Sequence, residues 1–173
     1  SSGTVGWWWR AYGVRGHRVM PGALELKIPP PLVALLCAVG MWLIAHYTIP
    51  YFFSPAMRWS LIAIYAVLGM AFSIGGVLAF RRSKTTIHPM HPENSSALVT
   101  YGIYRITRNP MYCGMASLLL AWAAYLQSPF SVLGIVVFVL YITQFQIKPE
   151  ERMLEKLFGD EFKHYKSRVR RWL

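Results

Sequence analysis

Charge is scarce in this sequence, and long stretches carry none. Only 14% of the residues are Asp, Glu, Lys or Arg, against roughly 25% in a soluble domain. Residues 32–57, 59–80 and 111–147 contain no charged residue at all. Apolar stretches of about 17–25 residues match the hydrocarbon core of a bilayer. The composition therefore excludes an ordinary soluble domain and predicts an integral membrane protein.

Cysteines and acidic residues are also few. Cys37 and Cys113 fall in different apolar stretches, which excludes a disulfide framework and favours simple packing roles. No metal is expected, because His88 and His91 lack a third nearby ligand. With seven acidic residues the formal charge is +11. The lysines and arginines flank apolar stretches, where they set membrane topology, so no nucleic-acid partner is expected.

Four apolar segments are predicted to span the membrane, over residues 31–49, 56–80, 111–127 and 130–147. The second segment is rich in small residues that permit close helix packing. Only Ser128 and Pro129 separate the last two segments, which predicts a tight antiparallel pair. The predicted fold class is an all-α membrane protein of about four transmembrane helices, with a polar loop over 81–110 and a C-terminal amphipathic helix.

The positions of the basic residues predict the orientation. At the connection between the first and second segments the one basic residue is Arg58, near the start of the second, and none separates the third from the fourth. Basic flanks stay cytoplasmic, so both termini and the polar loop are expected on the cytoplasmic side of an inner membrane. Residues 1–29 are interpreted as an interfacial extension, with residues 1–3 a cloning remnant, and residues 30–173 as the membrane domain. The final "KSRVRRWL" is expected to rest on anionic headgroups.

Two motifs on the cytoplasmic side have candidate chemistry. Arg108, Asn109, Pro110 and Tyr112 begin the third segment. Asn before Pro is a natural N-cap, and a helix N-terminus beside arginines attracts carboxylates and phosphates. The plainer alternative is that the arginines anchor the helix while Asn109 merely caps it.

The second motif is a pair of adjacent acids, Glu150 and Glu151, directly after the fourth segment. Carboxylates this close to a membrane cost free energy unless they are paired or used. The plainer alternative is a solvated first turn that follows Pro149. Hydrolysis by paired acids is disfavoured, since adjacent helical residues do not face each other.

Taken together, "HPENSSALVTYGIYRITRNPMY", the helical hairpin, "PEERMLEKLFGDEFKHY" and "RVRRWL" resemble the isoprenylcysteine carboxyl methyltransferase and phospholipid methyltransferase superfamily of integral membrane enzymes. That family's signature is Arg-His-Pro, a variable stretch, then Glu-Glu. Asn109 stands here in place of the histidine. Asparagine hydrogen-bonds but does not titrate near neutral pH.

The resemblance implies S-adenosyl-L-methionine as the cofactor, in a cytoplasmic pocket closed by the polar loop and the C-terminal helix. It also implies a lipophilic or membrane-associated methyl acceptor, with no obligatory protein partner. An arginine that holds the substrate carboxylate in eukaryotic members is replaced by Gln146, and no residue stands out as a catalytic base. The implied substrate contacts are Gln146, Glu151 and Arg108. The implied cofactor contacts are Ser96, Ala97, Leu98, Val99, Tyr104, Asn109, Pro110, Met111, Tyr112 and Glu150.

Several alternatives remain open at this point. Methyl transfer to an isoprenylcysteine-like carboxylate is the leading interpretation, and a phospholipid amine or a thiol are acceptors of the same fold. An NADPH-dependent sterol-reductase-like enzyme shares a similar membrane core but has a longer chain. A non-enzymatic four-span scaffold explains the charge distribution and leaves the 30-residue polar loop unexplained.

Overall fold

The computed structural model describes residues 28–85 and 98–173, and the regular elements in those ranges are helical. Three short helical turns accompany the α-helices. Two are tighter 3₁₀ turns, η3 (Gly102–Arg105) and η4 (Pro129–Ser131), and one is a wider π turn, η5 (Thr143–Ile147). The α-helices are α1 (Pro30–Tyr47), α2 (Pro55–Thr85), α3 (Pro110–Leu126), α4 (Val132–Ile142), α5 (Lys148–Phe158) and α6 (Asp160–Arg168).

Three of these helical stretches are long and apolar enough to cross a membrane: Pro30–Tyr47, Pro55–Ala79 and Pro129–Phe158. Helix α3 is apolar but shorter, at 17 residues, which corresponds to about 26 Å of helix. The predicted segments thus agree with observed helices, except that α2 continues to Thr85, past the predicted end at residue 80.

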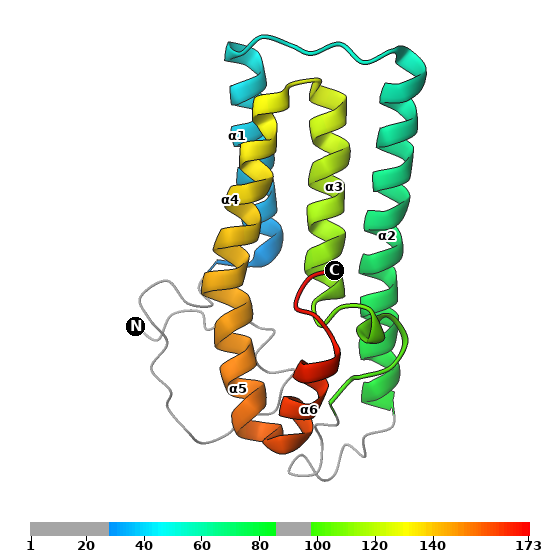
Figure 1. Cartoon of the computed structure of the whole chain (residues 1–173), viewed down its shortest axis with the longest axis vertical. Helices are drawn as coiled ribbons and strands as arrows, with labels where there is room; N and C mark the ends of the chain where they lie inside the picture. Colours follow the sequence, from blue (N-terminus) through cyan, green and yellow to red (C-terminus); the bar gives the residue numbers. More distant parts are fainter. Residues whose placement is uncertain (1–27, 86–97) are drawn as a thin grey trace.

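Helix α3 lies between α2 and α4, and α1 packs on α3 and α4 (Figure 1). At the top of the view, the linker over residues 48–54 crosses the turn between α3 and α4. It is held there by the Tyr51 amide, which donates to the Gln127 carbonyl at 2.7 Å, and by the Thr48 and Ser128 hydroxyls, 3.0 Å apart. Helices α5 and α6 lie toward the opposite end, and the chain runs back from α6 to finish beside the start of α3.

Small residues allow the close helix contacts. Gly114 of α3 faces Gly69 and Ser73 of α2 so closely that a Cβ atom on Gly114 would lie 2.8 Å from the Gly69 carbonyl oxygen. Gly134 of α4 similarly lies against the side chain of Met41. The small-residue pattern in the second segment is therefore confirmed as a packing surface, as is usual between membrane helices. The two cysteines are free.

The core lies between α1, α3 and α4, while the outer faces remain apolar. Met41, Phe138 and Ile142 are completely buried. Large apolar residues such as Val67 and Leu140 are about two-thirds exposed, at 66% and 64%. In a soluble protein such surfaces would aggregate, whereas lipid chains cover them in a bilayer.

The fourth segment does not end where the charged helix begins. Helices α4 and α5 form one continuous rod through η5, in which the Lys148 amide donates to the Thr143 carbonyl five residues back. Pro149 lacks an amide hydrogen and its ring crowds the preceding turn. The wider π turn directly before Pro149 accommodates that ring, and π turns are frequent at functional sites. Residues 129–158 therefore form one continuous helical stretch, in which Glu150 and Glu151 follow Pro149 in the first turn of α5.

Candidate functional site

The beginning of α3 and the junction of η5 with α5 meet at the end of the bundle where α6 lies. The Tyr112 hydroxyl donates to Glu150 Oε1 at 2.7 Å, although the two residues are 38 positions apart in the chain. Tyr112 stands two residues after Pro110, in the first turn of α3. The two motifs singled out in the sequence are therefore in direct contact.

Tyr104 joins this pair from the η3 turn. Burial raises the pKa of the Tyr104 hydroxyl to about 12, and the negative charge of Glu150 adds to the shift. The backbone carbonyl of Tyr104 accepts a hydrogen bond from the Tyr165 hydroxyl at 2.7 Å. Helix α6 thus holds η3 in place, and Tyr104, Tyr112 and Glu150 form one aromatic and acidic cluster.

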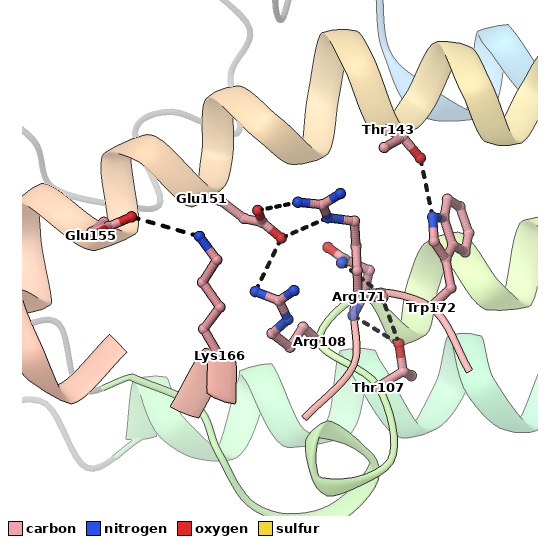
Figure 2. Close-up of polar contacts among 9 residues, drawn as sticks. Thr107, Arg108, Thr143, Glu151, Glu155, Lys166, Arg171 and Trp172 are labelled. Carbon is pink, nitrogen blue, oxygen red and sulfur yellow. Dashed lines mark hydrogen bonds and ion pairs between the residues drawn. The ribbon is translucent and has the colours of Figure 1, made fainter. Parts of the chain in front are cut away.

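Glu151 is buried, at 8% exposure, and is paired with two arginines (Figure 2). Arg171 binds it through two hydrogen bonds, from Nε to Oε1 at 2.9 Å and from Nη2 to Oε2 at 2.7 Å. Arg108 Nη1 lies 3.1 Å from Oε1. The hydrogen bond that Arg171 donates to Glu151 raises the pKa of Arg171, while burial lowers that of Arg108. Arginine stays protonated in either case, so the carboxylate is fully compensated.

Asn109 precedes α3 at the N-cap position, but its side chain makes no capping hydrogen bond. The predicted side-chain cap is therefore wrong. Asn109 Nδ2 instead donates to the Arg171 carbonyl oxygen at 2.9 Å, and the Thr107 hydroxyl donates to the same oxygen at 3.2 Å. The amide side chain is used to hold a distant segment, which outweighs local capping.

Gln146 lies in the π turn and is 1% exposed. Its Nε2 atom donates to the Ile28 carbonyl at 3.3 Å. Its Oε1 atom has no hydrogen-bond partner among the residues that the structure describes. Burying a hydrogen-bond acceptor without a partner costs about 1–3 kcal/mol of folding free energy. A ligand that donates a hydrogen bond to Gln146 Oε1 would remove this cost.

The other predicted site residues divide into two groups. Pro110 is buried and Met111 half-buried, and both lie against Gly76 of α2. Leu98 and Val99 are half-buried in the segment before η3. Ser96 and Ala97, together with His88 and His91, lie outside the described residues. Within residues 28–85 and 98–173, no group of three or more His, Cys, Asp and Glu side chains is placed to hold a metal ion.

Sequence reasoning missed the inward role of the last residues. Arg171 and Trp172 face the site rather than lipid headgroups: Trp172 Nε1 donates to the Thr143 hydroxyl at 3.1 Å, beside the Arg171–Glu151 pair (Figure 2). The expectation that the whole basic tail lies on the membrane surface is therefore wrong for these two side chains. The available signal was the place of Glu151 directly after an apolar segment, where a carboxylate needs to be paired or used.

An apolar cavity of about 140 Å³ lies at the opposite end of the bundle, beside the linker over 48–54. It is lined by Tyr51, Phe53, Leu61, Ala123, Ala124, Gln127, Ser128, Pro129 and Val132. None of these residues belongs to the Tyr104, Tyr112 and Glu150 cluster, so this cavity is separate from the candidate site.

Residues 57–161 match the family model described as phospholipid methyltransferase. A probable protein-S-isoprenylcysteine O-methyltransferase of Oryza sativa subsp. indica is 31% identical over 110 residues, covering 61% of this chain and 56% of the relative. Protein-S-isoprenylcysteine O-methyltransferase A of Arabidopsis thaliana is 28% identical over 106 residues, covering 61% of this chain and 54% of the relative. The chain thus spans about half the length of these two relatives.

An uncharacterized protein of Haemophilus influenzae is 49% identical over 63 residues, which is 36% of this chain and 100% of that protein. No solved structure matches the chain significantly. The family match covers well over half of the sequence and includes α3, the π turn and both glutamates. The chain belongs to the phospholipid methyltransferase family, a family of S-adenosylmethionine-dependent membrane methyltransferases.

Proposed function

We propose that the chain transfers a methyl group from S-adenosylmethionine to a lipophilic acceptor at the cytoplasmic face of a membrane. The observation that carries the proposal is the 2.7 Å hydrogen bond from Tyr112 to Glu150. It joins the start of α3 to the α5 end of the last apolar helix, with Tyr104 beside them. Family membership supplies the donor, and this cluster supplies groups suited to binding it.

The cluster fits the chemistry of the cofactor. S-adenosylmethionine combines an adenine ring with a ribose, an ammonium group and a sulfonium. Apolar and aromatic residues such as Leu98, Val99 and Tyr104 suit the flat ring, and a carboxylate such as Glu150 suits the hydroxyl or ammonium donors. The remaining proposed cofactor contacts are Ser96, Ala97, Asn109, Pro110, Met111 and Tyr112.

The proposed reaction is a direct displacement at the methyl carbon. The cofactor supplies an already activated methyl group, so the protein has to align donor and acceptor and exclude water. A carboxylate or thiolate acceptor needs no general base, whereas an amine must first lose a proton. None of the proposed contacts is assigned as a base, which favours a carboxylate or thiolate.

Acceptor binding is proposed at Gln146, Arg108 and Glu151. The unpaired Oε1 of Gln146 faces buried surroundings, where a donor on the acceptor would satisfy it. Arg108 Nε is likewise buried without a hydrogen-bond partner in the described part of the chain. Two plant relatives are named for O-methylation of isoprenylcysteine, which supports a lipid-tailed acceptor entering from the bilayer.

The proposed topology has four crossings, with α3 as the short one. In the sequence, the basic residues other than Arg58 fall before the first apolar segment, in the segment over 81–110 and after the fourth. Basic flanks stay cytoplasmic, so we propose that the cluster and both termini lie in the cytoplasm.

Ligand binding tests the proposal. In detergent-purified protein, titration calorimetry is expected to show binding of S-adenosylhomocysteine and none of NADPH. Glu150→Gln and Tyr112→Phe are each expected to weaken that binding about tenfold or more. The first removes the negative charge at Glu150, and the second removes the hydrogen bond from Tyr112 to that charged group, worth about 1.5–3 kcal/mol. Glu161→Gln and Tyr47→Phe are matched controls, since both parent side chains are exposed and remote from the cluster.

The outcomes separate the alternatives. Binding of NADPH alone would favour the reductase-like reading, and binding of neither ligand would favour a scaffold. Normal affinity in both Glu150→Gln and Tyr112→Phe would refute the site while leaving the family intact. A methyl-transfer screen with labelled cofactor and host lipid extracts then identifies the acceptor class.

A further inference from the structure

Residues 169–172 run across the candidate site, between the start of α3 and the η5–α5 junction (Figure 2). They follow α6 directly, and the first of them, Val169, has extended backbone. We call these residues the strap. On one side the strap contacts the motif at the start of α3, and on the other side it contacts the motif with Glu150 and Glu151. The contacts with these two motifs are of different kinds.

On the α3 side the strap is bound mainly through backbone groups. Arg170 forms an isolated parallel β-bridge with Thr107, and the Arg108 amide donates to the Arg170 carbonyl at 2.9 Å. The next carbonyl, that of Arg171, accepts from Asn109 Nδ2 at 2.9 Å and from the Thr107 hydroxyl at 3.2 Å. Backbone binding of this kind fixes the path of the strap whatever its side chains are.

On the η5–α5 side the strap is bound through side chains. The Arg171 guanidinium holds both oxygens of Glu151, at 2.9 and 2.7 Å, and Trp172 Nε1 donates to the Thr143 hydroxyl at 3.1 Å. A bidentate arginine–carboxylate pair sets orientation as well as distance. The strap is therefore hydrogen-bonded to both the π turn and the first turn of α5.

We propose that the strap sets the distance between the two motifs, and that Arg171 is a positioning residue for Glu150. The inference rests on the proposed cofactor site. Glu150 is adjacent to Glu151, so a rotation that frees Glu151 also moves Glu150 away from Tyr112. Without Arg171, the ion-pair partner left within 4 Å of Glu151 among the described residues is Arg108, whose Nη1 lies at 3.1 Å without hydrogen-bond geometry. A buried carboxylate that loses its bidentate partner turns toward water.

The consequence is a loss of cofactor affinity by misplacement. Binding groups displaced by about 1 Å cost up to about a hundredfold in function, and sites hold their geometry only when a supporting shell locks them. Arg171→Ala is thus expected to weaken S-adenosylhomocysteine binding about tenfold. Arg171→Lys, which keeps the charge but not the fork, is expected to recover part of that loss.

The test uses calorimetry with S-adenosylhomocysteine on the full chain in detergent, together with thermal unfolding. The matched control is Arg170→Ala, which removes an exposed arginine from the same strap without touching Glu151; its affinity is expected to equal that of the wild type. In a Glu150→Gln background, Arg171→Ala is expected to change affinity less than twofold, because its effect passes through Glu150. A merely structural arginine would cost the same affinity in both backgrounds.

The results separate this inference from the proposed function. No binding by the wild type would overturn the proposed function. Wild-type binding with equal affinities for Arg171→Ala and Arg170→Ala would overturn the strap alone, as would equal costs in both backgrounds. If Arg171→Ala does not fold, Trp172→Phe decides: it keeps an aromatic ring and loses only the hydrogen bond to Thr143, and it is expected to weaken binding severalfold. Unchanged affinity in that variant would overturn the strap.

Discussion

At the scale of single residues, the site is built from polar groups that find partners far away in the chain. Asn109 reaches Arg171 across 62 positions, and Tyr112 reaches Glu150 across 38. The two adjacent glutamates have different partners: Glu150 accepts from a tyrosine, and Glu151 is neutralised by arginines. Adjacent helical residues point in different directions, which is why one acid faces the proposed cofactor site and the other faces the strap.

Gln146 supplies a prediction at this scale. Gln146→Met keeps the volume, removes an unpaired buried acceptor and loses one long hydrogen bond of 3.3 Å. The free energy of unfolding is therefore expected to change by less than about 1 kcal/mol, with S-adenosylhomocysteine affinity unchanged. Methyl transfer to the acceptor found in lipid extracts is expected to fall about tenfold, because the acceptor loses a hydrogen bond.

Calorimetry and a labelled-methyl assay on the same preparation measure both quantities. Gln144→Met is the control, since Gln144 is exposed in the same π turn. Full transfer activity in Gln146→Met would remove Gln146 from the acceptor site.

At the scale of helices, close packing of α2 on α3 and the continuity of α4 with α5 place the two motifs. Gly69 and Gly114 let α3 approach α2 closely, which fixes the position of the start of α3 along α2. The continuous helical stretch from α4 to α5 brings both glutamates to the level of the start of α3. The π turn between α4 and α5 contains Thr143 and Gln146. In an unbroken α-helix these two polar side chains would point in other directions.

Gly114→Ala tests the first of these contacts. Its Cβ would lie 2.8 Å from the Gly69 carbonyl oxygen, and overpacking of this kind costs about 1–3 kcal/mol. The thermal unfolding midpoint in detergent is expected to fall. Gly40→Ala on α1, where nothing lies within 4 Å of the new methyl group, is expected to leave the midpoint unchanged or raise it. Equal midpoints for the two variants would contradict the close α2–α3 packing.

At the scale of the whole molecule, the two ends of the helical bundle differ in how many charged side chains they contain. Among the described residues, the cation at the end with the linker 48–54 is Arg58, which donates to the Tyr125 carbonyl at 2.7 Å and lies over the Tyr125 ring at 4.9 Å. The other end contains the arginines of the site and the helices α5 and α6. A single bound arginine among aromatic residues suits the outer interface, where aromatic belts occur.

Labelling from one side of the membrane checks the proposed orientation. Phe52→Cys places a thiol at a side chain that is 75% exposed in the linker, and Lys163→Cys places one on exposed α6. In intact cells a membrane-impermeant maleimide is expected to label the first, and to label the second only after permeabilisation. The parent protein, with Cys37 and Cys113 inside apolar helices, provides the background. The reverse labelling pattern would invert the topology.

Sequence patterns and the resemblance were enough to predict the helices and to bring Tyr112 and Glu150 into one region. The apolar stretches, the Ser128-Pro129 turn and the pairing of Tyr112 with Glu150 in one region all follow from composition, basic flanks and the resemblance. The alternative of a solvated first turn after Pro149 does not hold for Glu151, which is buried and paired with Arg171. The side-chain cap expected of Asn109 was wrong, because a distant carbonyl competed for its amide. Both expectations considered only neighbours in sequence.

The amino-acid sequence by itself determined that this is a membrane protein of the phospholipid methyltransferase family, since apolar length and motif order are properties of the linear chain. Only the tertiary structure decided that Arg171 neutralises Glu151, that Trp172 reaches the π turn, and that Tyr112 rather than Asn109 contacts Glu150. The physical reason is that a hydrogen bond depends on distances of about 3 Å and on direction. Residues 20 or more positions apart acquire such geometry only when the helices that bear them have packed.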